Sequence, residues 1–107
     1  MIIKGNWETR EVTLDDRRLD PRPSQKVYNH SPDGFNWGYP GSGPSQLALA
    51  IMLQAAKLDL AMQLYHQFKR DFVAVFPQSD FEVDIDVEGW IAGKMNVFQE
   101  SFAEEAI

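Results

Sequence analysis

The chain has 107 residues, 44% of them hydrophobic and 24% charged, and it carries a net charge of −6 with no cysteine. This is the composition of an ordinary globular protein, and it excludes disulfides, thiolate metal sites and a cysteine nucleophile. The length predicts a single compact domain over 1–107, with an acidic tail from about residue 99 that we expect to be flexible. The negative charge disfavours nucleic acid as the main partner, because phosphate binding requires clustered lysine and arginine.

The longest run without a charged residue, 34–56, does not predict a membrane span. Only its second half is apolar, and that half is shorter than the roughly 20 residues that a spanning helix requires. The N-terminus has no basic stretch followed by an apolar run, so the sequence predicts no signal peptide. We therefore expect a soluble, cytoplasmic protein.

Residues 1–19 predict a β-hairpin. An extended segment starts at Ile2, residues 11–14 alternate polar and apolar side chains, and Leu19 closes the second arm. The pair at 15–16 supplies the turn. The next segment, 20–24, cannot be the interior of a helix because it contains two prolines.

Residues 27–28 are expected to form a short strand edge, and 29–34 are dense in turn-forming residues. Phe35, Trp37 and Tyr39 follow at alternate positions. In an extended segment alternate side chains point to one side, so we expect the three rings to form one apolar wall that faces the core.

A helix is predicted to begin at Pro44, with Gly43 as its N-cap, because proline is favourable at the first helical position. Residues 45–56 carry no charge and place apolar side chains around most of the helix, which predicts a buried central helix. A second helix follows, with an apolar stripe at spacings of three and four. This stripe consists of Leu60, Ala61, Leu64, Tyr65, Phe68 and Phe72.

The segment 72–76 is either the last turn of that helix or a short strand, and Pro77 ends it. Residues 81–86 alternate strictly and predict a strand with a solvated acidic face. A third helix is expected from Asp84 or Asp86, burying Val87, Trp90, Ile91 and Met95. The predicted fold class is α+β, with a small N-terminal β-hairpin or sheet packed on two central helices plus a C-terminal helix.

The run from His30 to Ala50 fits the pattern HSPxGFxWGYxGSGPxQLALA. In this run the chain resembles an uncharacterised family of small proteins from bacterial genomes, phages and other mobile elements. The resemblance extends over nearly the whole chain, since residues 12–21 fit the hairpin that precedes the pattern and Trp90 fits an aromatic of the closing helix. Pro40, where the family usually has glycine, is the visible departure. The resemblance implies a mobile-element or prophage setting and no known reaction.

The turn of Gly41, Ser42 and Gly43 before a helix is typical of anion sites, since helix N-termini offer free N–H groups. Pro44, however, removes one donor, and no lysine follows as it does in a phosphate-binding loop. Close packing around the two glycines explains the turn better.

His30, Ser31 and Asp33 are residue types used in nucleophilic catalysis, but triads form from residues that are distant in the chain. We interpret them as turn residues, with His30 bonded to the backbone. A metal site would combine His30 and His66 with carboxylates of 80–88, yet no recognised ligand spacing is present. We therefore expect no catalytic residue, no metal site and no cofactor.

The remaining candidate is a recognition surface on the rigid aromatic loop. Its expected binding residues are His30, Phe35, Trp37, Tyr39, Gly41, Ser42 and Gly43. The first functional hypothesis is a non-enzymatic interaction module of a mobile element that binds a host protein complex through the surface from Tyr28 to Pro44, or self-associates. Two alternatives stay open: a small-ligand or nucleotide-binding domain that uses the Gly41–Gly43 turn, and a nucleic-acid accessory protein with an N-terminal basic patch.

Overall fold

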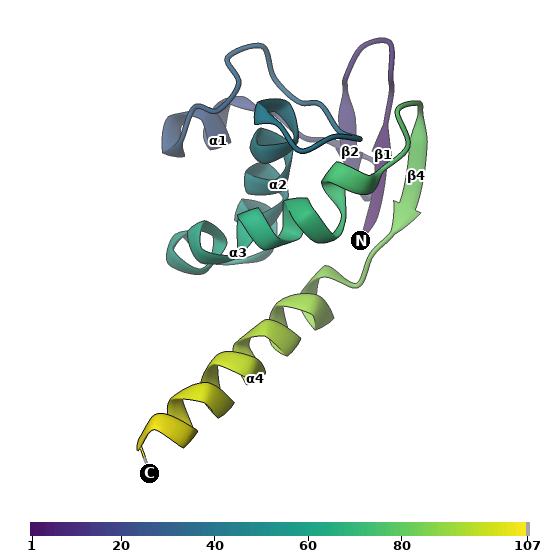
Figure 1. The fold of residues 1–107 in the computed structure, drawn as a ribbon. Coiled ribbons are helices and arrows are strands. Elements are labelled where there is room, and N and C mark those ends of the chain that lie inside the picture. The colour runs from purple at the N-terminus through teal and green to yellow at the C-terminus, as the bar shows by residue number, and fades with distance from the viewer. Residues whose placement is uncertain (107) are drawn as a thin grey trace.

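The structure is a computed structural model that describes the backbone of residues 1–106 and the side chains of residues 1–96. Its elements are, in chain order, β1 (Ile2–Gly5), β2 (Val12–Leu14), β3 (Arg17–Arg18), α1 (Arg22–Val27), α2 (Ser42–Ala55), α3 (Leu58–Asp71), the 3-10 helix η1 (Val73–Val75), β4 (Phe81–Asp84) and α4 (Val87–Ala106). Figure 1 shows the strands beside α2 and α3, with α1 on the far side of α2 and α4 leading away. The predicted α+β fold class is confirmed.

The four strands form one antiparallel sheet in the order β3-β2-β1-β4. Ile3 lies opposite Leu14 on one side and Val83 on the other, so β1 is a central strand. The predicted hairpin is confirmed, and its turn residues Asp15 and Asp16 have φ angles of 48° and 66°. Two consecutive left-handed residues are what a type I′ turn requires, and its twist matches that of the two flanking strands.

The helix α2 is the buried central helix that its uncharged sequence predicted. Every residue from Gly43 to Met52 is buried. The predicted stripe of α3 is also confirmed in its centre, where Ala61, Leu64, Tyr65 and Phe68 are buried. The two helices pack on one another and form the core together with the inner face of the sheet.

Trp37 joins the loop before α2 to the sheet. Its side chain is fully buried, contacts the ring of Phe81 edge-on at 5.0 Å between ring centroids, and donates from Nε1 to the carbonyl of Ser79 at 3.0 Å. Gly5 makes this packing possible. A Cβ atom on Gly5 would collide with the Phe81 ring and lie 2.9 Å from Cη2 of Trp37.

Residues 22–27 form the helix α1, so the strand edge expected at Val27 and Tyr28 was wrong. Pro21 is the N-cap of α1 and Pro23 lies in its first turn. The N–H groups of a first turn have no partner within the helix, so proline costs no hydrogen bond there. The two prolines that exclude a helix interior therefore mark the start of a helix.

The helix α2 begins at Ser42 with Gly41 as its N-cap, two residues before the start expected at Pro44. The assignment of Gly43 as N-cap was therefore wrong, and Pro44 occupies the third helical position instead of the first. Third-position proline still lies in the first turn, where no intrahelical N–H is needed. The segment after α3, left open between a last helical turn and a strand, is the 3-10 helix η1.

The acidic strand β4 is confirmed, and α4 begins after it at Val87. Val87 and Ile91 are buried as expected and Trp90 is partly buried, but Met95 is 41% exposed. The expectation for Met95 was wrong because α4 leads away from the other elements, as Figure 1 shows.

The tail predicted from about residue 99 lies outside the described side chains, and its backbone belongs to α4 as far as Ala106. Among residues 1–106, no helix is both long and apolar enough to cross a membrane. That the whole chain forms one compact domain stays a prediction.

Candidate functional site

A buried glutamine of α2 fixes the loop that carries His30. Gln46 is fully buried, and its Oε1 atom accepts the backbone N–H groups of His30 at 2.8 Å and Ser31 at 3.0 Å. Its Nε2 atom donates to Oγ of Ser24 at 2.9 Å and to the carbonyl of Tyr28 at 3.1 Å. Both ends of the amide are therefore satisfied, and they hold the end of α1 and the loop 28–31 against α2.

The ring of His30 lies among three other rings. Its Nε2 atom is 2.8 Å from the hydroxyl of Tyr65, and its ring stacks on Tyr28 with 4.3 Å between centroids. His66 lies edge-on to it at 6.2 Å between centroids. His30 was expected to bond the backbone, and its N–H does lie 3.2 Å from the carbonyl of Tyr28, whereas its ring bonds a hydroxyl on α3.

Tyr65 is buried, whereas Tyr28 is 54% exposed and His66 is also exposed. Lys69, one turn further along α3, donates from Nζ to Oγ of Ser45 at 3.1 Å. We call the group of Tyr28, His30, Tyr65, His66 and Lys69 the Tyr28 surface. It brings together α1, the following loop and the second half of α3.

Both histidines on this surface have a pKa below the ordinary 6.5. Burial lowers the pKa of His30, and the nearby His66 and Lys69 lower it further. Burial also lowers the pKa of His66, with Lys69 and Arg70 as additional causes. Burial raises the pKa of the Tyr65 hydroxyl, so this group stays protonated and can serve as a hydrogen-bond donor to His30.

The arrangement offers no relay and no metal cage. Ser31 and Asp33 do not bond the His30 ring, whose partner is Tyr65. Among the residues that the structure describes, no group of three or more histidine, aspartate or glutamate side chains could hold a metal ion. What the Tyr28 surface can supply is a stacked aromatic pair beside hydrogen-bonding imidazoles and an ammonium group.

The predicted aromatic wall divides into a buried and an exposed part. Phe35 and Trp37 are buried, at 6% and 0% exposure, but Tyr39 is 38% exposed, so its expected place in the core was wrong. Gly38 has a φ angle of 84°, a left-handed conformation that interrupts the extended chain between Trp37 and Tyr39. The alternation that aligns the first two rings therefore ends before the third.

The glycines of the turn before α2 serve close packing. A Cβ atom on Gly41 would collide with the Tyr39 ring, and one on Gly43 would lie 3.1 Å from the backbone nitrogen of Asn36. The N–H of Ser45 already bonds the carbonyl of Gly41 at 3.0 Å. Because Pro44 has no N–H, three instead of four backbone donors at this helix start lack a helical partner, those of residues 41, 42 and 43.

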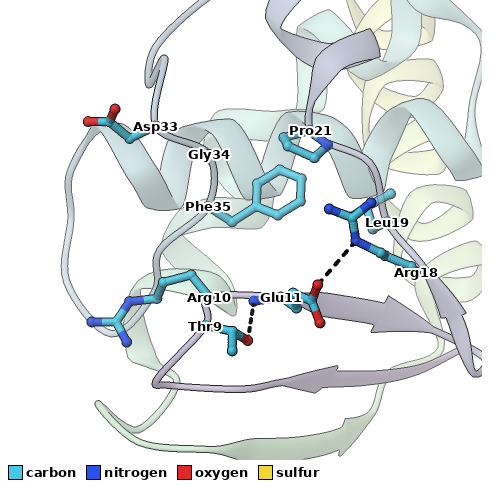
Figure 2. Close-up of a pocket in the computed structure, with 9 residues that line it drawn as sticks. All are labelled: Thr9, Arg10, Glu11, Arg18, Leu19, Pro21, Asp33, Gly34 and Phe35. Carbon is cyan, nitrogen blue, oxygen red and sulfur yellow. Dashed lines mark hydrogen bonds and ion pairs between the residues drawn. The ribbon is translucent and has the colours of Figure 1, made fainter.

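A small hollow of about 120 Å³ lies between the hairpin and the loop before α2. Thr9, Arg10, Glu11, Arg18, Leu19, Pro21, Asp33, Gly34 and Phe35 line it. Figure 2 shows Arg18 reaching toward Glu11, with 3.4 Å between Nε and Oε1, while Arg10 points away from Phe35. The hollow is below the roughly 300 Å³ at which small-molecule pockets begin.

Arg10 has a φ of 62°, and its guanidinium lies 3.6 Å above the Trp7 ring. Several side chains of the expected N-terminal basic patch thus bind other groups of the same chain. Besides this cation–π contact and the Arg18 pair, Arg22 binds Asp20 at 2.7 Å and Lys4 binds Asp16 at 3.1 Å. Arginines engaged in this way leave fewer free cations for a phosphate backbone.

The fold and this surface define a small α+β protein whose exposed aromatic and basic groups surround a rigid loop. Residues 4–93 match a family of unknown function, DUF6166. The chain belongs to this family. No curated protein and no solved structure matches it.

The sequence analysis named His30 and placed Tyr28 in the hypothetical interaction surface 28–44, but it missed Gln46, Tyr65 and Lys69 as parts of the same surface. A signal for Gln46 was present, because it is the first of only two amides in an otherwise apolar helix, and a buried amide must find partners. The grouping of α1 with the second half of α3 depends on tertiary packing and had no local signal.

Proposed function

We propose that this protein is a small, non-enzymatic interaction module that binds a protein partner through the Tyr28 surface. The observation that carries the proposal is the exposed Tyr28 ring, stacked on a His30 that is itself fixed by Gln46 and Tyr65. A preorganised tyrosine loses little conformational entropy on binding, which is why tyrosine is enriched at the energetic centres of interfaces. Val27, 37% exposed, adds apolar area next to Tyr28.

The resemblance to proteins of phages and other mobile elements supports a partner in a bacterial host, such as a defence complex that the module blocks. Tyr39 extends the proposed binding region toward the Gly41–Gly43 turn, because its ring covers Gly41 and is 38% exposed. The buried Phe35 and Trp37 would support this region from beneath instead of contacting the partner.

The two alternative functions have less support from the geometry. An anion at the Gly41–Gly43 turn would find few backbone donors, since Pro44 has none and Gly43 is buried against Asn36. A nucleic acid at the N-terminal patch would compete with the carboxylates of Glu11 and Asp20 for Arg18 and Arg22.

The proposal is tested by affinity capture from a bacterial extract with quantitative mass spectrometry. The baits are the unchanged protein, Tyr28→Ser, and Val75→Ser as a control for removing an exposed apolar side chain, since Val75 is 72% exposed on η1. We expect the same proteins with the unchanged chain and Val75→Ser, and their loss with Tyr28→Ser at an unchanged melting temperature. Equal capture by all three baits would contradict the proposal.

A Tyr39→Ser bait then determines whether the partner also reaches the turn before α2. Light scattering during size-exclusion chromatography decides whether the partner is a second copy of the chain. A dimer that Tyr28→Ser dissolves would identify self-association as the activity of this surface.

A further inference from the structure

Within residues 1–96, the basic side chains at the end of α3 have no carboxylate partner. None of the ion pairs formed within residues 1–96 includes Lys69 or Arg70. Lys69 Nζ has one hydrogen bond, to the neutral hydroxyl of Ser45 at 3.1 Å. An ammonium group has three donors, so two of them remain for another molecule.

The two histidines of the Tyr28 surface also lie in a positive electrostatic environment. Besides burial, basic side chains lower the pKa of both imidazoles: Lys69 acts on each, and Arg70 also acts on His66. No carboxylate is among the causes. In a chain with a net charge of −6, this is a region where positive charge is not balanced by nearby acids.

Three acidic groups, on β4 and at the end of α3, bind other partners. Glu82 and Asp84 lie on β4, where Glu82 is 3.4 Å from Lys4 and Asp84 is 3.4 Å from the N-terminal amine. Asp71, at the end of α3, is turned toward α4, where it accepts from Trp90 Nε1 at 3.0 Å. None of these carboxylates forms an ion pair with Lys69 or Arg70.

From these cations, which form no ion pair within residues 1–96 and lie beside the exposed Tyr28 ring, we infer that the Tyr28 surface binds an acidic segment of its protein partner, with a carboxylate on Lys69 and an apolar or aromatic side chain on Tyr28. The inference rests on the proposed function and names the chemistry of the partner. A short peptide carrying one or two carboxylates matches the small number of free cations. A nucleic acid carries a charge at every phosphate and would be repelled by the remaining acidic surface.

The two histidines are the only ones in the chain, so their imidazole resonances identify binding at this surface without further assignment. The probe is an end-blocked hexaglutamate peptide, titrated at neutral pH and low salt and followed by NMR. We expect saturable shifts of both imidazoles. Lys69→Ala should raise the Kd about two- to fivefold, as the loss of one exposed charge pair does, whereas the matched control Lys57→Ala should leave it unchanged.

Three results would overturn the inference. The first is the absence of a saturable shift, and the second is an equal response to hexaserine. The third is tighter binding of a single-stranded hexanucleotide than of hexaglutamate, which would identify the surface as a nucleic-acid site.

A charge reversal separates this inference from the proposed function. If Lys69→Glu abolishes the capture of the proteins that Tyr28→Ser also loses, both the function and the acidic partner are supported. If Tyr28→Ser abolishes capture but Lys69→Glu does not, the acidic partner is wrong and the interaction surface stands. If neither variant changes capture, the proposed function itself fails.

Discussion

The backbone N–H of His30 donates a 2.8 Å hydrogen bond to Oε1 of Gln46, which lies 16 positions later in the chain. This bond connects a surface loop to the most buried helix of the protein. The ring of His30 is then held from the other side by the hydroxyl of Tyr65 at 2.8 Å. The orientation of the exposed Tyr28 stack therefore depends on an amide that has no contact with solvent.

Replacing Gln46 by leucine should destabilise the fold by about 2–4 kcal/mol, because several polar groups each lose one hydrogen bond inside the protein. These groups are Ser24 Oγ, the Tyr28 carbonyl and the N–H groups of residues 30 and 31. Urea denaturation measures the loss, and amide exchange at residues 30 and 31 should accelerate with it. Gln54→Leu is the control, because Gln54 is an exposed glutamine of the same helix. Equal stability of the two variants would show that the hydrogen bonds of the buried amide do not stabilise the fold.

Gly5→Ala should destabilise the protein by about 1–3 kcal/mol, the usual effect of an added methyl group in a filled core. The new Cβ would collide with Phe81 and press on Trp37. Gly93→Ala is a matched control, for which we expect an increase in stability. Its Cβ meets nothing within 4 Å, and alanine favours a helix by about 1 kcal/mol over glycine. Thermal unfolding measures the stability of both variants. An unchanged melting temperature in Gly5→Ala would contradict the packing described between β1 and the loop.

The parts of this fold that the sequence predicts are those with a local physical cause. Asp15 and Asp16 predict a turn because aspartate tolerates left-handed φ angles, and the structure has both residues there. The uncharged stretch of α2 predicts a buried helix because no residue in it requires solvent, and the segment 43–52 is buried throughout.

The errors arise where tertiary contacts or a single unusual φ angle determine the outcome. Tyr39 was expected in the core from its spacing, but the left-handed Gly38 turns the chain before it. The helix α1 has only 6 residues and contains a proline, so its intrinsic helical preference is weak, and its contacts with Gln46 stabilise it. The approach of His66 to His30 depends on how α3 packs on α2, which no local pattern specifies.

The pKa of Asp20 offers a test of a surface contact. The Arg22 guanidinium, which bonds the Asp20 carboxylate at 2.7–3.1 Å, and the N–H of Arg22 hold this pKa at about 2. In Arg22→Gln it should rise toward the ordinary value of 3.8, yet stay below it because the backbone bond at 3.0 Å persists. Carboxyl NMR titration measures the change, with Arg17→Gln as the control. Since the pair is exposed, the melting temperature should be unaffected, and an unshifted Asp20 in the unchanged protein would refute the contact.

Acid should destabilise this protein through His30 and His66 before its carboxylates titrate. Both folded-state pKa values lie below the ordinary 6.5, with burial as the main cause and neighbouring positive charge as the second. Unfolded histidines therefore bind protons at a pH where the folded ones do not. Stability is complete above the unfolded pKa and falls as the pH decreases through 6.5 toward the folded values.

The melting temperature should accordingly decline between about pH 7.5 and about pH 5.5, a range above the ordinary pKa values of carboxylates. In the double variant His30→Gln/His66→Gln this decline should be smaller, because glutamine offers hydrogen bonds but does not titrate. The titratable groups that face the imidazoles are Tyr28, Tyr65, Lys69 and Arg70. Two results would contradict this account: the same decline of the melting temperature with pH in both proteins, or imidazole resonances that titrate at or above pH 6.5. Either result would show that the two rings are not desolvated and do not lie in the positive field that the proposed acidic partner requires.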